Sequence, residues 1–135
     1  MIKVFEENNK LSWFTTIAVA SIIFWVSSLT FGTGTFAIGI NAILYHIVAF
    51  FFFTLFLLFS STKGKKQYKI FLLVIIISIF YGITDEVHQF FVPGRNCGFF
   101  DLLLDSIGIF MASLFYLCRL LFLKNEKQPL NRTFS

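Results

Sequence analysis

Ionisable side chains gather in one short stretch of this sequence, YGITDEVHQFFVPGR at residues 81–95, directly after the apolar run KIFLLVIIISIF. The stretch supplies carboxylate, imidazole, amide and guanidinium groups: Asp85, Glu86, His88, Gln89 and Arg95. Two more carboxylates, Asp101 and Asp105, follow in DLLLDSIG. Carboxylates and imidazoles can act as a general acid–base pair or ligate a divalent cation. A guanidinium suits the recognition of phosphate or carboxylate.

Helical spacing would place several of these side chains on common faces. A helix over 69–91 has one face with the spacing i, i+4, i+7 and i+11, formed by Tyr81, Asp85, His88 and Val92. Glu86 and Gln89 lie on the flanks of that face. A helix over 101–123 has a face formed by Asp101, Asp105, Gly108 and Ala112, with Ser106 beside it. Small residues four apart let a neighbouring helix approach closely, and the simplest arrangement packs this face against the 69–91 helix.

This packing leaves more than one chemistry open. Asp85 and His88, together with Asp101 or Asp105, could bind a divalent cation or form a general acid–base pair. Arg95 could grip an anionic group. The spacing encodes none of these uniquely, so the cofactor is unknown, with a divalent cation as one option.

Several of the polar residues also have a purely structural interpretation. Asp101 would cap the start of its helix, and Arg95 would form a two-pronged ion pair with Asp85 or Asp105. His46 would be a hydrogen-bonded packing histidine on an apolar helix. Arg119 is expected to extend its charged end to the inner membrane surface. Ion pairs that only hold two helices together would need fewer charged residues than this cluster contains. The excess favours a functional site.

Composition identifies the chain as an integral membrane protein. Hydrophobic residues make up 57% of its 135 residues and charged residues only 13%, and the mean hydropathy is +0.81. No Asp, Glu, Lys or Arg occurs from Leu11 through Thr62. A helix needs about 20 apolar residues to cross the hydrocarbon, and four segments qualify: 11–31, 42–61, 69–91 and 101–123. The chain 1–135 is therefore predicted to be a single all-α domain, a bundle of four transmembrane helices.

The basic residues predict the orientation of these spans. With four spans, both termini and the 62–68 connection share one side, which holds ten of the eleven Lys and Arg residues, all except Arg95. Basic residues mark the cytoplasmic side, so both termini are predicted to be cytoplasmic and the 81–101 segment to face outward. The net charge of +4 is thereby explained by orientation and contact with anionic lipids, and nucleic acid is not an expected partner.

Polar residues from all four spans reach one depth. Counted from the cytoplasmic lysines at about 1.5 Å per residue, Ser27, Ser28, His46, Asp85 and Asp105 lie roughly 24–29 Å away, just under the ~30 Å of the apolar slab. They are expected to meet near the outer surface. The candidate site residues are Asp85, Glu86, His88, Gln89, Arg95, Asp101, Asp105 and His46.

The stretch DEVHQFFVPGR followed by DLLLDSIG resembles the hallmark of the VanZ-like family, Asp-Glu-x-His-Gln-x-Phe-Val-Pro-Gly-Arg and then Asp-x-x-x-Asp-x-x-Gly. Upstream, Ser27 and Ser28 look like the family's serine pair, and His46 like its histidine. Ile43 stands where the family usually has a lysine. The resemblance implies a multi-pass protein of the cell membrane with four spans and a link to the cell envelope. The family's namesake is associated with resistance to the glycopeptide teicoplanin.

Three functions compete for the polar cluster. It could act on a lipid headgroup or a lipid-linked envelope precursor at the outer surface, or it could bind or shield such a lipid or a drug without catalysis. Whether the protein is an enzyme is therefore open. An ion pathway is disfavoured because no charged residue marks the inner half of any span before Arg119. Membrane lipids and a lipid-linked envelope precursor are the expected partners.

Overall fold

The computed structural model describes residues 2–29, 40–93, 95 and 98–126. Every element in this part of the chain is a helix: α1 (Ile2–Glu7), α2 (Asn9–Ser27), α3 (Ile40–Thr62), α4 (Tyr68–Phe90) and α5 (Phe99–Glu126). Four of these described helices, α2 to α5, are long and apolar enough to cross a membrane. The predicted all-helical fold with four candidate spans is confirmed.

The start of α2 follows a local capping signal. α2 begins after Asn8, whose side-chain Oδ1 accepts a hydrogen bond from the Leu11 amide at 3.1 Å. It ends at Ser27, with Ser28 as its C-cap, short of the predicted end at residue 31; residues 30 and 31 lie outside the described part. The short helix α1 was not predicted, because the search for long apolar runs does not detect a six-residue helix.

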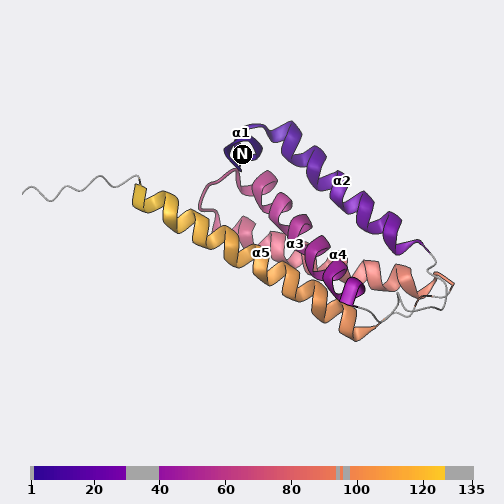
Figure 1. Ribbon diagram of the computed structural model, residues 1–135. Helices are drawn as coiled ribbons and strands as arrows, with labels where there is room; N and C mark the ends of the chain where they lie inside the picture. The colour runs from indigo at the N-terminus through magenta and orange to yellow at the C-terminus, as the bar shows by residue number, and fades with distance from the viewer. Residues whose placement is uncertain (1, 30–39, 94, 96–97, 127–135) are drawn as a thin grey trace, which may run out of the picture.

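The helix α3 lies at the centre of the bundle, between α2 and α5 (Figure 1). It contacts α2, α4 and α5, and its contact with α5 is the most extensive. Its buried Phe50, Phe53 and Leu58 meet Tyr116 of α5 in one apolar core. Large apolar side chains cover the exterior, as with Phe110 at 67% exposure. An exterior of this kind suits contact with lipid rather than with water.

Gly108 explains why α5 packs on α3. A Cβ atom at this position would lie 2.4 Å from the Ile47 carbonyl oxygen and 3.0 Å from the Phe51 amide nitrogen. Only glycine permits this approach, and the neighbouring Ala112 is fully buried. The prediction that this face packs against the 69–91 helix is wrong for Gly108, which meets α3, whereas Asp105 of the same face lies against Gly82 of the 69–91 helix. A stripe of small residues predicts a close approach without identifying the neighbour.

Polar contacts also join the helices at the end of the bundle away from His46. Ser60 of α3 bonds Ser12 and Thr16 of α2 at 2.8 and 2.9 Å. Arg119 of α5 forms a two-pronged ion pair with Glu6 of α1. Arg119 therefore does not extend freely to the surface as predicted, because the unforeseen α1 places a carboxylate beside it.

Candidate functional site

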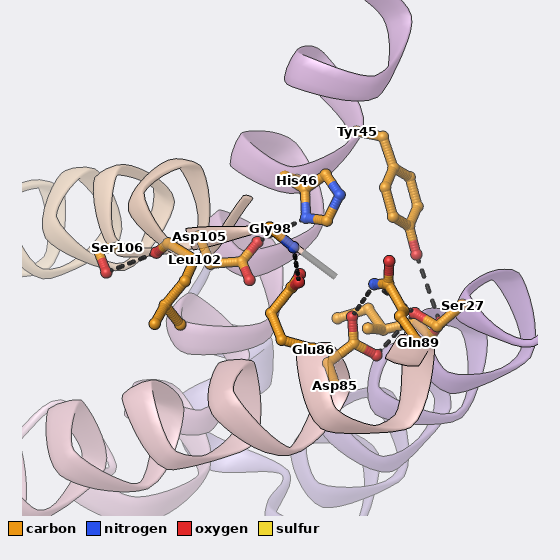
Figure 2. A network of polar contacts seen from close by, with 11 residues as sticks. Ser27, Tyr45, His46, Asp85, Glu86, Gln89, Gly98, Leu102, Asp105 and Ser106 are labelled. Carbon is orange, nitrogen blue, oxygen red and sulfur yellow. Dashed lines mark hydrogen bonds and ion pairs between the residues drawn. The ribbon is translucent and has the colours of Figure 1, made fainter. Parts of the chain in front are cut away.

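Buried polar side chains from α2, α3, α4 and α5 meet at one end of the bundle (Figure 2). Five of the eight predicted site residues are at most 5% exposed there: His46, Asp85, Glu86, Gln89 and Asp105. His88, Arg95 and Asp101 are half-buried. The cluster divides into two groups, one between α3, α4 and α5 and one on the end of α2.

The first group is centred on His46. Its Nδ1 lies 2.9 Å from Oδ1 of Asp105, so the pair joins α3 to α5. The close contact at Gly108, one turn further along α5, is what brings Asp105 within reach of the imidazole. The second oxygen of Asp105, Oδ2, is buried and has no hydrogen-bond partner among the described residues. It points toward α4, where a Cβ atom on Gly82 would lie 3.4 Å from it.

Glu86 of α4 belongs to the same group. Its Oε2 accepts a hydrogen bond from the Gly98 amide at 3.1 Å, which fixes the carboxylate against the start of α5. Its Oε1 is buried without a hydrogen-bond partner in the described part of the chain. Asp101, in the first turn of α5, is nearby: one ligand atom each from His46, Glu86 and Asp101 lie within 4.8 Å of one another.

Asp85 faces the other way, toward α2. The hydroxyl of Ser27 donates to its Oδ1 at 2.6 Å, and Nε2 of Gln89 donates to its Oδ2 at 2.8 Å. Both carboxylate oxygens are thus satisfied by the protein itself. Asp85 and Glu86 are neighbours in sequence but about 100° apart around the helix, so they serve different groups.

His88 and Arg95 also dock on the end of α2. Ser28 donates its only hydroxyl hydrogen to the Phe24 carbonyl at 2.7 Å, so the 2.9 Å contact with Nε2 of His88 makes the histidine the donor. The His88 ring stacks on Phe24. Nη2 of Arg95 donates to the Val26 carbonyl at 3.1 Å. Carbonyls in the last turn of a helix lack helical partners and attract positive charge, so these contacts hold the end of α2.

The observed helix face differs from the predicted one. The buried side of α4 runs through Ser78, Gly82, Asp85, Glu86 and Gln89, whereas the prediction centred it on Tyr81, Asp85, His88 and Val92. Helical spacing alone accommodates both patterns. α4 packs mainly against α3 and α5 and touches α2 less extensively, and this arrangement buries the first pattern.

The residues that lie close together also differ from the predicted ligands of a cation. Asp85 and His88 bond to α2, while His46, Glu86 and Asp101 come together instead. The Gly98 amide, which orients Glu86, was not foreseen; a glycine shortly before a helix start gives only a weak signal. The predicted turn at Pro93 and Gly94 is closed by a bond from the Arg95 amide to the Val92 carbonyl at 3.2 Å, although Gly94 itself lies outside the described residues.

The arrangement can support proton transfer and cation binding. An imidazole held by a carboxylate has a fixed orientation, as a general base requires. Carboxylate oxygens left without partners in a buried site can accept hydrogen bonds from a ligand or coordinate a cation.

Comparison with known proteins agrees with the sequence resemblance. The family model described as VanZ/LLP1 matches residues 3–123, which include all four candidate spans and every residue of the cluster. Neither the curated proteins nor the solved structures gave a match. Because the family model covers most of the chain, this protein is a member of the VanZ/LLP1 family.

Proposed function

We propose that the polar cluster acts on the headgroup of a lipid or of a lipid-linked envelope precursor at the outer surface of the cell membrane. The observation that carries this function is the pair of buried carboxylate oxygens, Glu86 Oε1 and Asp105 Oδ2, that have no partner among the described residues. Ionisable groups at membrane depth cost several kcal/mol unless they are paired. A cluster built only for packing gains nothing from leaving them unsatisfied.

The position of the cluster suits a lipid substrate. His46, Glu86 and Asp105 all lie within about two turns of a helix end. The distribution of basic residues predicts that this end faces outward, at the depth where headgroups meet the hydrocarbon. The headgroup of a lipid in the outer leaflet would lie at the depth of the cluster.

The chemistry expected of the first group is general acid–base catalysis on a polar headgroup. Asp105 orients the imidazole of His46 and stabilises its protonated form, so His46 would take and return a proton. Glu86 and Asp101 would bind the hydroxyl or amine groups of the headgroup, or a cation that accompanies it.

A second candidate, a non-catalytic lipid- or drug-binding protein of the envelope, is favoured by the second group. Asp85, His88 and Arg95 all bond to residues of α2, so much of the family hallmark serves to hold the bundle end together. A protein of this kind would occupy or shield a precursor and so alter access of a glycopeptide such as teicoplanin.

Lipid and precursor profiling of membranes tests both candidates. Cells that produce the parent protein should show a changed lipid or precursor composition compared with cells that produce Asp105→Asn. Glu7→Gln, which alters an exposed carboxylate of α1, should behave as the parent does. An unchanged composition together with binding of extracted precursor by the purified protein would favour the binder. If neither composition nor binding depends on Asp105, both candidates are wrong.

A further inference from the structure

We infer that His46, Glu86 and Asp101 form a divalent-cation site that joins α3, α4 and α5. This inference deepens the proposed function, on which its biological meaning rests: with the ion bound, His46 serves as a ligand and not as the group that accepts a proton. The site can be tested without knowledge of any substrate. Each of the three residues comes from a different helix, and one ligand atom of each lies within 4.8 Å of the others.

The geometry is close to that of a coordination sphere. Imidazole nitrogen and carboxylate oxygen bind Zn²⁺ at about 2.0–2.2 Å, so tetrahedral ligands lie about 3.4 Å apart. A separation of up to 4.8 Å is wider than this value, so rotation of the side chains would have to bring the ligand atoms closer together. Asp101 is half-buried in the first turn of α5 and has room for that rotation.

The burial and hydrogen bonding of Glu86 are a second, independent indication of a ligand. The residue is only 5% exposed, and its Oε1 has no hydrogen-bond partner in the described part of the chain. Its other oxygen is held by the Gly98 amide at 3.1 Å. Carboxylates that ligate metals are commonly held in this way, with one oxygen bonded to the protein and the other directed at the ion.

Asp105 supplies a supporting carboxylate. It contacts the imidazole of His46 at 2.9 Å, and its second oxygen is buried without a hydrogen-bond partner among the residues that the structure describes. A histidine that binds a metal almost always has such an orienting partner. The carboxylates of Glu86, Asp101 and Asp105 converge around one imidazole, and a divalent cation would offset the repulsion between them.

The donor set indicates the class of cation. Two carboxylates and one imidazole form too small an oxygen cage for Ca²⁺, which takes six to eight oxygen ligands. Imidazole and carboxylate together suit Zn²⁺ and Mn²⁺, with Zn²⁺ bound more tightly. Three protein ligands leave at least one position for water or for an oxygen of a headgroup.

Metal binding to the purified full chain in detergent tests this site. After treatment with a chelator, the parent should bind Zn²⁺ saturably at one ion per chain, and more weakly Mn²⁺, with a rise in melting temperature. Glu86→Gln and His46→Gln should lose more than about tenfold in affinity, and Asp105→Asn about tenfold or more. Glu7→Gln is the control: it neutralises an exposed carboxylate of α1, outside the cluster, and should keep the parent's affinity for Zn²⁺.

Absence of saturable binding of both ions by the parent would overturn the inference. Binding that survives Glu86→Gln and His46→Gln, or that is lost equally in Glu7→Gln, would overturn it as well. If Glu86→Gln fails to fold, Asp101→Asn provides the same test, because its half-buried side chain tolerates an amide. A changed membrane lipid composition without metal binding would contradict the cation site alone and leave the proposed function standing.

Discussion

Replacement of Gly108 by alanine should loosen the contact between α3 and α5 and separate His46 from Asp105. The new methyl group would lie 2.4 Å from the Ile47 carbonyl oxygen, about 1 Å closer than an ordinary van der Waals contact. Both of the nearest contacting atoms belong to the backbone of α3, and they cannot rotate away as a side chain would. The two helices must therefore move apart.

The expected cost follows from two opposing effects. Overpacking of a close contact costs about 1–3 kcal/mol, and a rigid backbone neighbour places Gly108→Ala near the upper end. The change from glycine to alanine within a helix returns about 1 kcal/mol. The net loss in the free energy of unfolding is then about 2 kcal/mol. A separation of about 1 Å would also stretch the 2.9 Å contact between His46 and Asp105 beyond hydrogen-bonding distance.

Gly82→Ala is the matched control for this experiment. A Cβ atom at Gly82 would meet the Phe50 ring at 3.3 Å and Asp105 Oδ2 at 3.4 Å, which are side-chain atoms able to shift. Thermal melts in detergent should rank Gly108→Ala clearly below both the parent and Gly82→Ala. If Gly108→Ala melts at or above the parent, the close packing of α5 on α3 does not set the position of Asp105.

Two further predictions concern orientation and the division of the cluster. A membrane-impermeant thiol reagent should label Cys97 in intact cells, whereas a tag at Ser135 should stay inaccessible until the membrane is opened; an accessible tag would contradict the basic-residue topology. Asp85→Asn should lower the melting temperature, because one amide oxygen cannot replace both carboxylate oxygens that accept from Ser27 and Gln89, and a buried group left unsatisfied costs about 1–3 kcal/mol. Asp105→Asn should melt near the parent yet lose function, since its amide nitrogen can take the place of Oδ2, which has no hydrogen-bond partner in the described part of the chain; equal melting of the two variants would contradict this division.

The sequence was sufficient to predict four apolar helices and the residue types of the candidate site. Both predictions depend on residue type alone: long apolar segments are suited to contact with lipid, and ionisable side chains at membrane depth require partners. The depth estimate expected His46, Asp85 and Asp105 near one level, and the structure buries all three at one end of the bundle. Their roles in function remain a prediction.

The pairing of these residues could not be predicted, because it depends on which helices touch. The small residues Gly108 and Ala112 predicted that another helix approaches closely, but only the observed contact identifies this helix as α3. The same uncertainty affected Arg119, whose partner Glu6 lies 113 positions away in the unforeseen α1. Sequence spacing describes one helix at a time, and contacts between helices arise from the packing of all of them.

The adjacent residues Asp85 and Glu86 show how one motif serves two purposes. Asp85 bonds Ser27 and Gln89 with both oxygens and so ties α4 to α2, as His88 and Arg95 do further along. Glu86, turned toward α5, keeps one buried oxygen without a partner in the described chain, beside His46 and Asp101. Because a buried carboxylate oxygen without a partner is a candidate for contact with a ligand, we expect the chemistry at Glu86 and its neighbours, while Asp85 and its neighbours hold the bundle end together.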